Sequence, residues 1–286
     1  MAERKERLLT PQSAAATGTI VEKPLSLWER LYAKSALRKT VVLIFLAVLW
    51  EVYARWLSNP LLFPTFGATV QAFIDGIMTG GLPGRAWYSL RILLIGYAAG
   101  ISCAALLTAF AISSRLGADF LDTLTSMFNP LPAIALLPLA LIWFGLGQGS
   151  LIFVLVHSVL WAVALNTHSG FLSVSNTLRM VGRNYGLKGP AYVARLLIPA
   201  AFPSILTGLK IGWAFAWRTL IAAELVFGVS SGSGGLGWFI YENKNQLEIP
   251  SVFAGLFSVI LIGLFVENVI FRNIELRTVR RWGMQS

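Results

Sequence analysis

The chain has 286 residues, of which 56% are hydrophobic and only 13% are charged, and its mean hydropathy is +0.69. A soluble domain is nearer half apolar and a quarter charged, so the composition excludes an ordinary soluble protein and predicts an integral membrane protein. The net charge of +10 arises mostly between and outside the apolar runs. That distribution favours membrane orientation and argues against nucleic acid as a partner.

Six apolar runs approach the length of about 20 residues that a membrane-spanning helix needs. We therefore predict an all-α fold with six transmembrane helices. The expected spans are residues 40–57, 87–112, 120–146, 150–165, 211–227 and 252–271. The fourth run is the shortest and can extend toward Phe171.

The third run is unusual because it contains Pro130, Pro132 and Pro138. Proline lacks the backbone N–H and kinks a helix. Broken backbone is not tolerated where it faces lipid, so this span is expected to face protein or a water-filled path.

Most Lys and Arg residues fall in the N-terminal segment, the loops after the second and fourth spans, and the C-terminal segment. The positive-inside rule then predicts that both termini are cytoplasmic. We expect a cytoplasmic tail over residues 1–39, a transmembrane domain over 40–271 and a second tail over 272–286. The cytoplasmic loop between the fourth and fifth spans covers about residues 169–199.

This loop contains an amphipathic pattern followed by a turn. Apolar side chains recur at helical spacing from Val174 to Tyr185, after a possible serine cap, and Gly186 stands where a helix-ending glycine is expected. Lys188-Gly189-Pro190 predicts a turn, and a second helix is expected over residues 191–198, ending at Pro199. The residues alone leave two readings open, a docking surface for a protein and a helix lying on lipid headgroups.

The loop resembles the EAA loop of binding-protein-dependent ABC importer permeases, whose pattern is Glu-Ala-Ala, three residues, Gly, nine residues and Ile-x-Leu-Pro. Nine residues separate Gly186 from Leu196-Leu197-Ile198-Pro199, but Met180-Val181-Gly182 replaces Glu-Ala-Ala. Three further stretches resemble the nitrate/sulfonate/taurine-type branch, and the resemblance covers about residues 44–277. They are NPLPAIALLPLALIWFGLG (129–147), LIPAAFPSILTGLKIGWAFAW (197–217) and AAELV (222–226).

The resemblance implies a type I importer permease with a cytoplasmic coupling helix, in a bacterial inner membrane. It implies three protein partners: cytoplasmic ABC ATPase subunits that bind ATP and Mg, an extracytoplasmic solute-binding protein and a second permease copy. Membrane lipid is expected to surround the spans. The transported solute is expected to be a small anion. The expected ATPase-coupling residues are Arg179, Arg183, Tyr185, Gly186, Leu187, Lys188, Gly189 and Pro190.

No catalytic or metal site is expected. Cys103 is the single cysteine, the two histidines are 11 residues apart, and no P-loop sequence occurs. The GSGGLG stretch (232–237) matches G-x-G-x-x-G but follows a span instead of a strand, so a flexible turn is expected there. The chain is therefore expected to hold no cofactor of its own.

Ionisable residues within spans are costly and are retained for a reason. Arg218 lies near the middle of the fifth span, and two readings stand beside each other: contact with a passing anion, or an ion pair with Glu51 or Glu267. Glu224 is expected to accept hydrogen bonds in packing or gating. The expected translocation-path residues are Asn129, Pro132, Trp217, Arg218 and Glu224.

The leading prediction is an ATP-driven importer permease. The alternative is a self-sufficient secondary transporter or channel, which would show inverted repeats or paired broken segments. The chain has one Pro-rich span and no convincing repeat.

Overall fold

The computed structural model describes residues 34–227 and 234–281 of the chain. Every regular element in this part is helical, which confirms the all-α prediction. The chain divides into two units, one ending at Trp50 and one beginning at Glu51. Helix α2 (Ser35–Leu57) crosses that boundary and is long and apolar enough to span a membrane.

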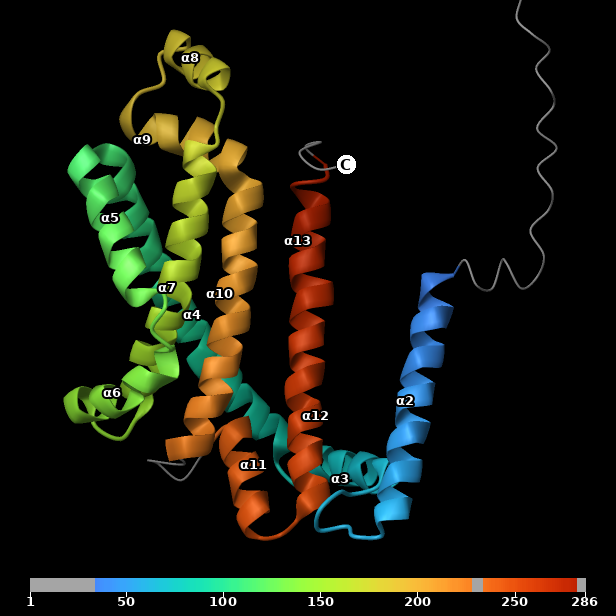
Figure 1. Cartoon of the computed structure of the whole chain (residues 1–286). Helices are drawn as coiled ribbons and strands as arrows, with labels where there is room; N and C mark the ends of the chain where they lie inside the picture. Colours follow the sequence, from blue (N-terminus) through green and yellow to red (C-terminus); the bar gives the residue numbers. More distant parts are fainter. Residues whose placement is uncertain (1–33, 228–233, 282–286) are drawn as a thin grey trace, which may run out of the picture. The chain divides into compact units, whose positions relative to one another are not determined.

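The second unit holds the remaining helices (Figure 1). They are α3 (Phe66–Met78), α4 (Leu82–Ser113), α5 (Arg115–Phe128), the 3-10 turn η1 (Ala133–Leu136), α6 (Leu137–Phe144), α7 (Gln148–Leu172), α8 (Asn176–Asn184), α9 (Gly189–Tyr192), the π-helical η2 (Val193–Leu197), α10 (Ile198–Phe227), α11 (Leu236–Asn245), α12 (Ile249–Phe265), the π-helical η3 (Val266–Phe271) and α13 (Arg272–Arg277).

Within the described residues, five helices are long and apolar enough to cross a membrane, and a bent pair makes up to six. The bent pair is the Pro-rich third run: Arg115–Phe128 and Ala133–Phe144 meet at 87°. The break falls at the Asn129-Pro130-Leu131-Pro132 sequence, because two prolines supply no N–H for helical hydrogen bonds. The predicted kink is confirmed. The fourth span does extend past Phe171, since α7 ends at Leu172.

The expectation that the second helix of the loop ends at Pro199 was wrong. Helix α9 continues through η2 into α10, so that one helical segment runs from Gly189 to Val226. In η2 the Ile198 N–H bonds to the Val193 carbonyl, five residues back. This wider turn comes directly before Pro199, and we attribute the tolerance of that proline to the altered hydrogen-bond pattern there.

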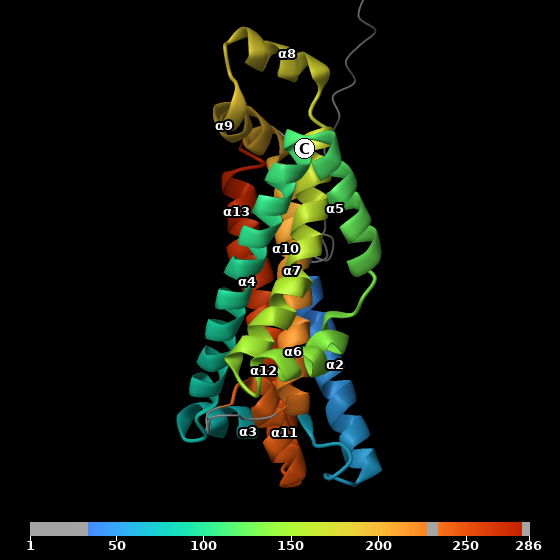
Figure 2. The same cartoon turned by 90° about the vertical axis from the view of Figure 1, so that its left-hand side faces the viewer.

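Helix α7 forms the centre of the core, packed along α4 and α10 (Figure 2). Leu155 and Val159 of α7 are buried against Gly96 and Gly100 of α4, where the two backbones approach closely. The small-xxx-small pair of glycines makes that approach possible. Tyr97 joins α4 to α10 by donating a hydrogen bond to the Leu209 carbonyl at 2.8 Å.

Two short helices were not expected from the sequence. Helix α3 packs against α12, where Phe73 and Phe257 meet edge to face at 5.3 Å. Helix α11 packs on α10 and α12 at the end of the unit opposite α8 (Figure 1). Lys210 of α10 pairs with Glu275 of α13 at 2.6 Å and links these helices at the α8 end.

The close contact between α4 and α7 leads to a prediction. A Cβ at Gly100 would lie 2.7 Å from Val159 Cβ, which cannot move without the backbone. We expect Gly100→Ala to destabilise the protein by roughly 1–3 kcal/mol, as overpacked cores do. The measurement is the thermal midpoint in detergent. Gly84→Ala, on the same helix with open space around it, is the control, and equal midpoints for the two variants would contradict this packing.

Candidate functional site

A pocket of about 310 Å³ lies at the break in the third span. Residues 129–134 form one wall, and α7 and α10 form the others. Asn129, Pro132 and Arg218, three of the five residues expected to line a path, all line it. The structure therefore brings the Pro-rich break and the mid-span arginine together in one place.

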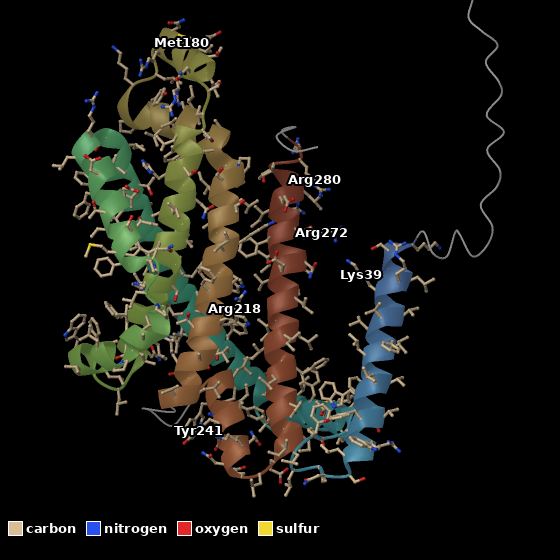
Figure 3. The ribbon with its side chains drawn as sticks, viewed as in Figure 1. Lys39, Met180, Arg218, Tyr241, Arg272 and Arg280 are labelled. Atoms are coloured by element: carbon tan, nitrogen blue, oxygen red, sulfur yellow. The ribbon has the colours of Figure 1, made fainter. Side chains whose placement is uncertain are left out.

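Arg218 projects from α10 and its residue is exposed (Figure 3). No carboxylate of the described residues lies within ion-pair distance of it, and Glu51 instead pairs with Arg55 at 2.7 Å. The expected alternative, an ion pair of Arg218 with Glu51 or Glu267, is thus not present in this structure. The guanidinium supplies a positive charge to the pocket.

The α7 wall contributes hydrogen-bonding and aromatic groups. Ser158 donates to Thr219 Oγ1 at 3.0 Å, which joins α7 to α10 beside the pocket. Trp161 is buried, and its indole N–H has no acceptor among the described residues. His157 lies next to Trp161 with ring centroids 6.0 Å apart. The wall can therefore present aromatic surface and an N–H donor to a small solute.

Trp217 and Glu224, the other two residues expected on the path, do not line this pocket. Trp217 is buried and its indole N–H donates to the Val259 carbonyl at 3.3 Å, which fastens α10 to α12. Trp217 neighbours Arg218 in sequence, but successive helical residues face different sides. Its position is that of a core side chain.

Glu224 lies in a buried hydrogen-bond network at the far end of α10. Ser89 Oγ of α4 lies 2.9 Å from both carboxylate oxygens, and the Gly237 N–H donates to Oε2 at 2.9 Å. The Leu236 N–H donates to Ser89 Oγ at 2.9 Å. Glu224 and Ser89 thus satisfy free N–H groups at the start of α11, where a negative charge is also favoured by the helix dipole.

The glycines of the GSGGLG stretch have a packing role here. A Cβ at Gly235 would lie 2.1 Å from Ser89 Oγ and 2.2 Å from a Glu224 oxygen. Only glycine lets the backbone come this close to the network. Gly232 and Ser233 lie outside the described residues. Helix α11 begins at Leu236, so the predicted turn does not extend beyond Gly235.

The loop between α7 and α10 forms the second candidate site (Figures 1 and 2). Ser175 caps α8 by accepting from the Leu178 N–H. After α8, Gly186 has φ of +74° and Gly189 has φ of +53°, backbone conformations that favour glycine. The predicted first short helix and the glycine turn after it are therefore present, whereas the second helix continues into α10.

The loop has an outer and an inner face. Tyr185 is 82% exposed, and Gly186, Lys188 and Pro190 are also exposed. Arg179 instead turns inward and donates to the carbonyls of Val174 and Phe171 at the end of α7.

The eight expected coupling residues thus do not share one surface. Arg179 and Arg183 line a cavity behind the loop, and Leu187 packs on the small cluster around Leu196 and Leu197.

The structure also shows the surroundings of residues 180–182, where Met-Val-Gly replaces Glu-Ala-Ala. Met180 is 57% exposed and lies at the tip of the loop (Figure 3). Gly182 is buried against Leu196, since a Cβ there would lie 2.2 Å from Leu196 Cδ1. The glycine at the third position of the motif therefore permits a tighter contact between α8 and η2.

Sequence reasoning missed the α7 wall of the pocket. His157, Ser158 and Trp161 all line it, and their spacing of i, i+1 and i+4 places them near one face of a helix. That signal was weak because most neighbours in α7 are also apolar or small. This face of α7 can be recognised as a pocket wall only in the structure, where the break at residues 129–132 lies opposite it.

Comparison with known proteins places the chain in a family. The model described as "Binding-protein-dependent transport system inner membrane component" matches residues 96–279, more than half of the chain. The chain belongs to this family. It is a multi-pass membrane protein with the type I ABC permease fold and acts as a permease subunit of an ABC importer, and family membership gives no support to a self-sufficient transporter.

Several curated relatives are similar in sequence to this chain over most of their own length. The nitrate import permease protein NrtB of Synechocystis is 29% identical over 87% of this chain and 90% of its own. The taurine transport system permease protein TauC of Escherichia coli is 29% identical over 78% of this chain and 82% of its own. An ABC transporter permease from Methanocaldococcus jannaschii is 32% identical over 77% of this chain and 83% of its own.

The Glu224 network gives a prediction for stability. In Glu224→Ala the Gly237 N–H and the Ser89 hydroxyl lose their buried acceptor, at a cost of about 1–3 kcal/mol. Glu224→Gln keeps an acceptor oxygen and is expected to cost less. Thermal midpoints in detergent measure both, with the exposed Glu248→Ala as control; a Glu224→Ala midpoint equal to that of the control would show that the network does not stabilise the fold.

Proposed function

We propose that the chain carries a small anionic solute from an extracytoplasmic binding protein across a bacterial inner membrane, driven by ATP hydrolysis in a separate subunit. ATP and Mg are bound by that partner ATPase, since the chain has no P-loop sequence. The observation that carries the proposal is the pocket at the broken span, where an arginine of an apolar span has no acidic partner among the described residues.

The outer face of the α8–α9 loop is proposed as the ATPase-docking surface. Tyr185 and Lys188 are exposed on either side of Gly186, whose positive φ fixes the turn between them. An exposed aromatic residue beside a fixed turn suits insertion into a groove of a partner protein. A lipid surface would impose no such turn geometry.

The orientation follows from charge. The end of the unit that bears α8 and α9 carries Arg115, Arg179, Arg183, Lys188, Arg195, Arg272 and Arg277 in its helix ends and turns. We propose that this end faces the cytoplasm, with both termini on the same side. The opposite end, with α3, α6 and α11, would then meet the binding protein.

An anion suits the pocket for chemical reasons. Arg218 supplies charge, Asn129 can donate from its amide, and Trp161 has an unpaired N–H. The relatives include a nitrate import permease and a taurine transport permease, and both solutes carry a negatively charged oxyanion group. Taurine and similar sulfonates also have an apolar part that the Phe215 and Trp161 side of the pocket would accept.

A second permease copy is proposed to complete the path. The pocket is open on one side, and α6 next to it exposes Ile142 at 79% and Trp143 at 58%. A symmetric pair would bring two such pockets to a shared axis. In that arrangement broken backbone would line the path and not face lipid.

Docking can be tested with the tagged chain in its own host membrane. We expect a P-loop ATPase to co-purify in stoichiometric amount, measured by quantitative mass spectrometry, and to be lost in the double variant Gly186→Glu with Lys188→Glu. Gly81→Glu, which also replaces a glycine of positive φ in open space, controls for backbone strain. Retention of the ATPase by the double variant would exclude this loop as the docking surface.

The solute path is tested by Arg218→Gln. We expect solute uptake into proteoliposomes holding the complete complex to fall at least about tenfold, as when one charged hydrogen-bond partner worth about 1.5–3 kcal/mol is removed. Complex assembly should be unchanged. Arg91→Gln, an arginine of α4 that does not line the pocket, is the control, and normal uptake by Arg218→Gln would remove it from the path.

A further inference from the structure

Two adjoining cavities lie behind the α8–α9 loop. The outer one has about 970 Å³ and is lined by the loop, the α4–α5 corner and the end of α7. The inner one has about 360 Å³ and lies between α4, α7 and the start of α10. They share the lining residues Ala109, Ile112, Phe171, Val193 and Ile198, so the two cavities adjoin at these side chains.

The outer cavity is basic. Arg115, Arg179 and Arg183 line it, and none of them has a carboxylate within 4.0 Å among the described residues. Tyr192 also lines it, and its buried hydroxyl has no hydrogen-bond partner in the described part of the chain. Arg179 already donates to the carbonyls of Val174 and Phe171. Arg115, Arg183 and the Tyr192 hydroxyl remain as donors for an anion, with no carboxylate beside these arginines in the described part of the chain.

The inner cavity is apolar. Its lining is aliphatic or aromatic except for Thr108 and Thr167. Both threonines are at least nine-tenths buried, and neither hydroxyl has a partner among the described residues. A volume of 360 Å³ would hold about a dozen waters at roughly 30 Å³ each, and two hydroxyls cannot hydrogen-bond that many. An apolar occupant with an oxygen acceptor satisfies this lining better than water.

We propose that the paired cavities bind one anionic phospholipid. Its phosphate would meet the arginines of the outer cavity, and one acyl chain would enter the inner cavity. Phosphate and ester oxygens are acceptors only, which complements the guanidinium groups of Arg115 and Arg183 and the Tyr192 hydroxyl in this lining. Basic pockets between transmembrane helices at the cytoplasmic surface are suited to anionic headgroups.

The site is distinct from the proposed docking surface, though it rests on the proposed orientation for its place in the cytoplasmic leaflet. Tyr185 and Lys188 line neither cavity, whereas Gly189 and Pro190 border the outer one. Val193 and Ile198, in contrast, belong to η2 and the start of α10 and contact both cavities. A bound lipid would therefore fill the space between the docking loop and the helices that it moves.

The test titrates the purified, delipidated complex with phosphatidylglycerol or phosphatidylcholine and counts bound lipids by native mass spectrometry. We expect one tightly bound phosphatidylglycerol per permease chain and weaker binding of phosphatidylcholine. Arg115→Gln should weaken phosphatidylglycerol binding about fivefold, the effect of one basic residue near an anionic headgroup. Arg277→Gln removes a charge at the same end without lining the cavity and should leave binding unchanged.

The acyl chain is tested separately. Ala109→Phe places a large side chain where the two cavities meet and should abolish tight binding, while Ala98→Phe, at an exposed α4 position outside both cavities, should not. Competition by glycerol phosphate alone would reveal a headgroup site without a chain and would overturn the lipid assignment.

Equal binding of the two lipids, or full binding by both Arg115→Gln and Ala109→Phe, would also overturn the lipid assignment. The ATPase ratio measured in the same samples reports on the docking surface independently. A complex that keeps its ATPase but shows no preference for phosphatidylglycerol would reject the lipid site alone. Loss of the ATPase from the wild-type complex would instead count against the proposed function.

Discussion

Inside a bilayer every backbone N–H and C=O needs a partner within the protein, because lipid offers none. This constraint decides where the chain can depart from a regular helix. In the described part of the second unit, departures within or beside the spans occur at the Asn129–Pro132 break, at the π-helical turn before Pro199, at the π-helical η3 and at the start of α11. Apart from η3, these departures coincide with a pocket, the docking loop or a buried polar network.

The three departures other than η3 are satisfied in different ways. At the third-span break the freed groups border a pocket in which water or solute can reach them. In η2 the hydrogen bonds shift to five-residue spacing and remain within the helix. At the start of α11 the partners come from other helices, since Glu224 and Ser89 accept the Gly237 and Leu236 N–H groups. The buried polar side chains of Ser89 in α4 and Glu224 in α10 are therefore explained by the need to pair these backbone N–H groups.

How much of this could be read from the sequence depends on whether the signal is local. The prolines of NPLP and the glycine at position 186 act on their own backbone, so the break and the turn were predictable. Pro199 was misjudged because its effect depends on the hydrogen-bond pattern of the preceding turn, which sequence does not display. Glu224 and Ser89 are 135 residues apart, and only the packing of α4 on α10 shows that they act together.

The same limit applies to the candidate site. An arginine within a span carries an energetic cost, but the sequence does not show which group offsets it. The structure shows no ion pair of Arg218 among the described residues, and contact with an anion stays a proposal. The α7 residues that share its pocket carry no unusual sequence signal. Arg179 and Arg183 are four residues apart and lie on the same face of a helix. Only Arg179 donates to backbone carbonyls near the end of α7, because the chain folds back there, and the sequence does not show this difference.

The continuous helical segment from Gly189 to Val226 connects the two sites mechanically. Its first turn belongs to the docking loop, and Arg218 lies in its last quarter. The rotation of this segment is fixed by buried neighbours on its other faces, Trp217 against the Val259 carbonyl and Leu220 in the core. Side chains on one rigid helix have fixed directions relative to one another. If a movement of the loop rotated this helical segment about its axis, Arg218 would rotate with it relative to the break at residues 129–132. The π-helical turn lies between loop and arginine, at the point where such a shift would enter the membrane-spanning part of the segment.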